Sequence, residues 1–187
     1  MPTLYVCFLQ NDVELMESHW LNRMAAYLAP KSEHSPKIHV ELFFPDNTRH
    51  EDIVEGKACS IHYGGRVFLQ KKRFSRKQWS FRTLNVTQNQ YDKIQMFCEG
   101  HKGNPFNYLG YYLQPINVFG LHPYSFTYVG MNPKWFCSEI CIEALKSGGV
   151  LKENVSPSIH PQTLFEMLED STTADCVRNY DKFDIQF

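Results

Sequence analysis

Apolar and polar positions in the first half of the chain alternate in short runs, a pattern that is typical of β-strands. One amphipathic stretch interrupts them, because Asp12 can cap a helix that runs to about Leu28. The charged residues 49–55 and the pair Gly64-Gly65 are expected to connect strands. The expected strands cover residues 3–9, 37–44, 57–63, 66–70 and 79–86.

Helical patterns dominate the second half. Thr87 and Gln90 form a capping-box pattern that opens a helix ending at about Glu99. Residues 103–130, rich in Gly, Pro, Asn and Tyr, are expected to be irregular. Helical spacing returns at Cys137, and a last helix is expected after Pro161, to about residue 168. Strands followed by helices predict an α+β fold with a central antiparallel sheet.

The length of 187 residues predicts a single domain over 1–187, with a core at about 3–168 and a polar C-terminal tail. A net charge of -1 gives no general attraction to nucleic acid. No apolar run approaches the roughly 20 residues that a membrane span needs. The cysteines lack a framework spacing, and no export signal is recognisable, so reduced thiols and a cytoplasmic location are expected.

The most informative stretch is Lys-Trp-Phe-Cys-Ser-Glu-Ile-Cys, residues 134–141. Cys137 stands where an aromatic run stops and a helix begins. The partial positive charge at a helix N-terminus favours the thiolate, which is the nucleophilic form. The alternative is a small buried hydrophobic residue, a common role for cysteine. Cys141, one turn later, is expected in the core, because no Cys-x-x-Cys pair supports a zinc site and a disulfide within one helix is strained.

A cysteine nucleophile needs a base, and His39 is the best placed histidine, in the apolar strand His-Val-Glu-Leu-Phe-Phe. Taken alone, it can equally be a histidine at the rim of a half-exposed strand. The charged run 71–77 is expected to be a solvated hairpin, although such a run can also contact phosphate groups or a membrane surface.

Together, the His39 strand, the strand that follows it at 57–63 and a late Cys137-Ser138-Glu139 helix resemble the circularly permuted branch of the papain-like, NlpC-type cysteine hydrolases. That superfamily also holds the lecithin retinol acyltransferase-like proteins. The aromatic-Asn segment 105–108 and Ser156-Pro157 before the last helix add to the resemblance. It covers about residues 3–168 and implies a papain-like sheet or half-barrel packed against the nucleophile helix.

The resemblance implies that Cys137 is the nucleophile and that His39 is the general base. A third polar residue on the next strand normally orients the histidine. Position favours Ser60, chemistry favours His62, and Glu41, on the face of His39, is a weaker third option. The backbone N–H of Cys137 is the expected first oxyanion donor, with Tyr5 as a guess for the second.

The resemblance also implies the class of reaction, which is hydrolysis of amide, ester or thioester bonds through a thioester intermediate, with no cofactor and no metal. The substrate remains open among a peptide, a protein modifier and a lipid, the last by deacylation or acyl transfer. A catalytically inactive binding module with the same fold is the alternative of another class. The oligomeric state is not readable from the sequence.

Overall fold

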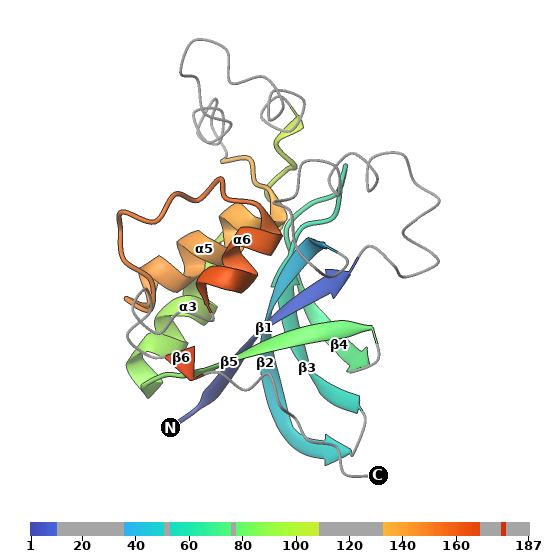
Figure 1. The fold of residues 1–187 in the computed structure, drawn as a ribbon, viewed down its shortest axis with the longest axis vertical. Coiled ribbons are helices and arrows are strands. Elements are labelled where there is room, and N and C mark those ends of the chain that lie inside the picture. Colours follow the sequence, from blue (N-terminus) through green and yellow to red (C-terminus); the bar gives the residue numbers. More distant parts are fainter. Residues whose placement is uncertain (11–35, 51–52, 76–77, 109–132, 169–176, 179–187) are drawn as a thin grey trace.

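The computed structural model describes residues 1–10, 36–50, 53–75, 78–108, 133–168 and 177–178. In these residues, antiparallel strands form one sheet with the order β4-β3-β2-β1-β5-β6, so the first strand of the chain lies in its middle (Figure 1). The strands are β1 Thr3–Gln10, β2 Lys37–His50, β3 Ile53–Ser60, β4 Phe68–Ser75, β5 Trp79–Asn85 and β6 Val177–Arg178.

Helices cover one face of this sheet (Figure 1). The described ones are α3 Gln88–His101, α5 Cys137–Ser147 and α6 Pro161–Met167. The expected α+β class with an antiparallel sheet is therefore confirmed. None of the helices that the structure describes is long and apolar enough to span a membrane.

Strand alternation divides the apolar side chains between the two faces of the sheet. Val40 and Leu42 of β2 face the helices and belong to the main core, together with Ile140 and Leu145 of α5. Phe43 faces the other way. The second face carries a smaller cluster that consists of Cys7, Phe43, Ala58 and Phe74, with Tyr5, Phe68, Trp79 and Phe81 packed against it. His39 and Glu41 alternate with Val40 and therefore point to this second face.

The capping-box prediction for α3 is confirmed: Thr87 Oγ1 accepts from the Gln90 N–H, and the Gln90 side chain accepts from the Thr87 N–H. Helix α5 ends at the glycine pair 148–149, with Gly148 as its C-cap. Gly149 has φ +68°, a left-handed conformation that glycine adopts without steric cost. Gly148 lies so close to α3 that a Cβ there would be 2.5 Å from Ile94.

The connection predicted over residues 49–55 is wrong. The backbone of β2 continues to residue 50, and β3 begins at residue 53, earlier than the predicted 57. Pro45 misled the prediction, because a proline usually ends a strand. Here the β2–β3 register shifts between Pro45 and Arg49, and this irregularity lets pairing resume beyond the proline. The strand predicted at 66–70 likewise begins and ends later, at 68–75. The helix predicted from Asp12 lies outside the described residues.

Candidate active site

The site begins where β2 and β3 separate. Their pairing near this end starts at Leu42 and Cys59, so Val40 has no partner residue on β3. Its carbonyl accepts instead from the Ser60 hydroxyl at 2.6 Å and from Cys141 Sγ at 3.7 Å. The Val40 backbone also hydrogen-bonds the sulfur of Cys137 in a way that stabilises the thiolate, which requires its N–H as the donor. The edge of β2 left open at Val40 is thus the place where α5 docks.

The start of α5 is fixed by backbone contacts on its N-terminal side. Trp135 is fully buried, its N–H donates to Pro105 O at 3.1 Å, and its carbonyl accepts from the Asn107 N–H at 3.1 Å. Glu139 closes the first turn, since its Oε2 accepts from the Phe136 N–H at 2.9 Å. The aromatic-Asn segment singled out in the sequence therefore holds the residues that lead into Cys137.

Cys137 and His39, predicted as a pair from the sequence, are in hydrogen-bond contact. Burial raises the pKa of the Cys137 thiol, but the hydrogen bond and charge of His39, with backbone hydrogen bonds from Val40 and Ser138, bring it below the ordinary value. Burial likewise lowers the pKa of His39, but hydrogen bonds to Cys137 and then to Glu41 raise it to about 9. These opposite shifts favour a thiolate–imidazolium pair at neutral pH.

Glu41 is the hydrogen-bond partner of His39 on the other side of its ring, with Nε2 and Oε1 3.1 Å apart. Its side chain is completely buried. Burial raises the pKa of this carboxyl, but the hydrogen bond and charge of His39, followed by those of Lys72, lower it below its usual range. An ionised Glu41 can hold the imidazole in one orientation and stabilise its positive charge.

Of the third residues weighed from the sequence, Glu41 hydrogen-bonds His39, whereas the preferred Ser60 and His62 make other contacts. The Ser60 hydroxyl is committed to the Val40 carbonyl at 2.6 Å. His62 stacks on His39, with ring centroids 5.1 Å apart and planes 29° apart, a geometry that brings faces together instead of hydrogen-bonding nitrogens. Burial, followed by the charge of His39, lowers the pKa of His62 to about 4, so it is neutral at physiological pH.

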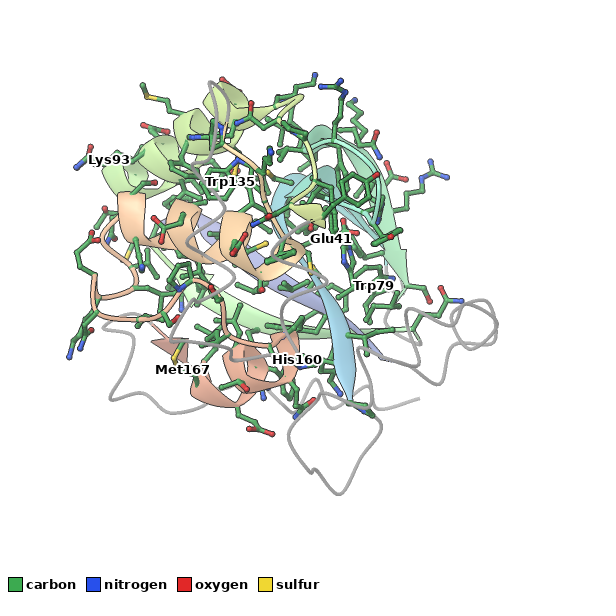
Figure 2. The ribbon with its side chains drawn as sticks, turned by 90° about the horizontal axis from the view of Figure 1, so that it is seen from above. Glu41, Trp79, Lys93, Trp135, His160 and Met167 are labelled. Carbon is green, nitrogen blue, oxygen red and sulfur yellow. The ribbon has the colours of Figure 1, made fainter. Side chains whose placement is uncertain are left out.

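Lys72 also belongs to the site, although the sequence analysis expected it in a solvated hairpin. Its Nζ donates to both oxygens of Glu41, at 2.6 and 2.9 Å. The alternation of β4 carried the signal: Lys72 shares a face with Phe68 and Phe74, whereas Lys71 and Arg73 are exposed on the other face. Figure 2 shows Glu41 and Trp79 near each other among the strands, apart from Lys93 and Met167 on the helix side.

The potential metal-ligand atoms of His39, Glu41 and His62 lie within 4.8 Å of one another, close enough to bind one metal ion after small side-chain movements. Both Glu41 oxygens already accept from the Lys72 ammonium. A metal ion would have to displace this cation or share the carboxylate with it at a cost in repulsion. We therefore assign no metal site to these residues.

The oxyanion donors proposed from the sequence occupy different surroundings. Cys137 is the first residue of α5, where a backbone N–H has no partner within the helix. The Tyr5 ring packs against Phe43 and Phe81, with both centroid distances 6.2 Å, inside the smaller cluster. The Tyr5 ring is thus a packing residue in this structure, whereas the Cys137 N–H has the position expected of an oxyanion donor.

Comparisons with protein-family models, with curated proteins and with solved structures found no match for this chain.

Proposed function

We propose that this chain is a cysteine hydrolase that uses Cys137 as the nucleophile, His39 as the proton carrier and Glu41 as the residue that orients His39. The contact between a helix-start cysteine and a strand histidine is the observation that carries the proposal. The order of these residues, with the histidine strand first and the cysteine helix late, supports assignment to the permuted papain-like architecture. The antiparallel sheet with α5 against β2 and β3 agrees with that architecture.

The reaction follows from the positions of the three side chains. The Cys137 thiolate attacks a carbonyl carbon, and the resulting oxyanion accepts from the Cys137 N–H. Because Nε2 of His39 faces Glu41, we assign Nδ1 to the sulfur side, where it delivers a proton to the departing nitrogen or oxygen. Water then loses a proton to His39 and attacks the thioester, which releases the acid and restores the Cys137 thiolate and the His39 imidazolium. Glu41 stays ionised throughout.

Two classes of substrate fit this chemistry. Cleavage of an amide, as in a peptidase, isopeptidase or amidase, uses the imidazolium to protonate a poor amine leaving group. Phospholipid deacylation or acyl transfer uses the same thioester with another acceptor. The exposed rings of Tyr63 and Tyr108, 5.7 Å apart and both packed on Phe106, give an apolar surface that favours testing lipids.

The lowered pKa of the Cys137 thiol favours an enzyme over the inactive binding module, which needs no thiolate. The decisive experiment incubates the full chain with peptide, ubiquitin-like conjugate and phospholipid panels and searches for an acyl adduct on Cys137 by mass spectrometry. The expected adduct disappears in Cys137→Ala and persists in Cys98→Ala, which changes a buried core cysteine. A protein whose Cys137 reacts with iodoacetamide no faster than an ordinary thiol would contradict the proposal.

A further inference from the structure

Lys72 approaches the site from β4 and binds the carboxylate that orients His39. Its Nζ lies 2.6 Å from Oε1 and 2.9 Å from Oε2 of Glu41. Oε1 is the same oxygen that lies 3.1 Å from His39 Nε2. The side chains of Cys137, His39, Glu41 and Lys72 therefore form a continuous chain of polar contacts across α5, β2 and β4.

This contact crosses a whole strand, because β3 lies between β2 and β4 in the sheet. Gly56 pairs with Lys72 on one side and with Pro45 on the other, and a Cβ at Gly56 would be 2.2 Å from the Phe44 carbonyl. The next residue on this face is Ala58, which is also small. Neither position carries a bulky side chain on the face of β3 that Lys72 crosses to reach Glu41.

Three aromatic rings surround the ammonium group of Lys72. Its Nζ lies 5.1 Å from the ring centroid of Phe68, 5.5 Å from that of Phe74 and 5.7 Å from that of Trp79. Cation–π attraction and the ion pair hold the ammonium at one place. Its side chain is 23% exposed, while that of Glu41 is 0% exposed. A solvated surface lysine has neither the rings nor the buried partner.

We propose that Lys72 is a positioning residue, an inference that rests on the proposed hydrolase mechanism. The Lys72 ammonium keeps Glu41 ionised and fixed against His39, and so holds the Cys137–His39 pair in the reactive arrangement. Lys72 touches neither the sulfur nor the imidazole in this role and acts through Glu41.

The other titratable groups near Glu41 do not replace this cation. Cys7 lies opposite Glu41 in the β1–β2 register, and Cys141 approaches from α5. Burial raises the pKa of both thiols well above the ordinary value, so both are neutral at physiological pH. The low pKa of His62 leaves it neutral as well. Among the residues that the structure describes, the positive charges that face Glu41 are thus those of His39 and Lys72.

Iodoacetamide alkylation of Cys137, followed across pH by peptide mass spectrometry on the full chain, tests the role without a known substrate. The wild-type rate should rise in two steps, the first where the thiolate forms beside the imidazolium and the second near pH 9, where His39 loses its proton. In Lys72→Met, which keeps the apolar stem but removes the charge, Glu41 takes up a proton more readily and stabilises the imidazolium less. The second step should therefore move to lower pH by about one unit or more.

Four further variants separate positioning from packing. Lys72→Arg keeps the charge and should retain two well separated steps, and Lys72→Gln is a second neutral variant should Lys72→Met fold poorly by circular dichroism. Lys71→Met removes a charge from the exposed face of the same strand and should leave both steps in place. In the Glu41→Gln background, Lys72→Met should shift neither step further, because the lysine acts through the carboxylate.

The outcomes distinguish this inference from the proposed function. A wild-type profile with two steps that the neutral variants leave unmoved would overturn the role of Lys72 and leave the hydrolase proposal standing. A wild-type profile with a single step at the pH of an ordinary thiol would overturn the hydrolase proposal itself. An additive effect in the double variant would show that Lys72 acts by some route other than Glu41.

Discussion

His39 and Glu41 lie two positions apart on β2, and Nε2 of the imidazole is 3.1 Å from Oε1 of the buried carboxylate. Both side chains leave the strand on the same face, so a rigid stretch of backbone sets their relative position. The residue proposed to orient the imidazole therefore comes from the His39 strand itself and not from the next strand, where the sequence favoured it.

Glu41→Gln should lower the pKa of His39 by about one unit or more, because a nearby carboxylate charge is lost. NMR titration of the imidazole measures this directly against the wild-type value of about 9. The matched control is Glu55→Gln, which removes a carboxylate paired with the exposed Arg73. If the imidazole titrates at the same pH in Glu41→Gln and in the wild type, Glu41 does not stabilise its charged form.

Cys137→Ala should change how stability depends on pH. The folded-state pKa of His39, about 9, lies above the ordinary 6.5, so the charged ring stabilises the fold below pH 6.5, and this contribution is lost as the pH rises through about 9. Without the sulfur, which is the largest cause of the raised pKa, the loss should occur at lower pH. Urea unfolding between pH 6 and 10 measures it, with Cys98→Ala as the control for a buried cysteine away from His39.

His62→Phe should preserve the alkylation rate of Cys137, because the neutral ring of His62 acts by stacking on His39 and Phe68, with centroid distances of 5.1 and 4.8 Å. His62→Ala removes the stack, which is worth about 0.5–1.5 kcal/mol, and should slow alkylation by roughly two- to tenfold. Equal damage in both variants would instead indicate that an imidazole nitrogen of His62 takes part in proton transfer.

Gly148→Ala should destabilise the protein by about 1–3 kcal/mol, because the added methyl group would overlap Ile94 of α3. Gly100→Ala is the matched substitution in open space, since nothing lies within 4 Å of a Cβ at that position of α3. It should stabilise the protein by about 0.5–1 kcal/mol through helix propensity. Thermal or urea unfolding of the two variants checks the opposite signs, and equal signs would contradict the close packing of α3 and α5.

Dialysis against EDTA should leave the alkylation profile of Cys137 unchanged, because Lys72 supplies the cation that Glu41 binds. Mass spectrometry of the alkylated peptide before and after dialysis provides the comparison. A profile that shifts on dialysis and returns when zinc is added would assign His39, Glu41 and His62 to a metal centre instead.

The two residues proposed to react could be selected from the sequence because each has a local signature. Cys137 marks the start of an amphipathic helix, and the structure begins α5 at that residue. His39 lies in an apolar strand that the structure places at 37–50. The contact between Cys137 and His39 depends on packing between residues far apart in the sequence. The family resemblance suggested this contact, whereas the periodicity of the sequence alone did not.

The third residue was less predictable for a physical reason. The choice of Ser60 or His62 assumed that β3 stays beside β2 as far as His39, but the two strands separate beyond the Leu42–Cys59 pair. Lys72 was missed because a run of like charges is usually solvated, and only the alternation of β4 separates it from its exposed neighbours Lys71 and Arg73.

The opening beside Val40 has a consequence for how this protein tolerates change. The sulfur and the start of α5 are held there by main-chain atoms, which every amino acid except proline supplies in the same form. Position 40 can therefore vary among apolar residues that fit the core without displacing the nucleophile. Only a proline at that position removes the N–H that reaches the Cys137 sulfur. The buried side chain at position 40 can therefore change during evolution without loss of this hydrogen bond.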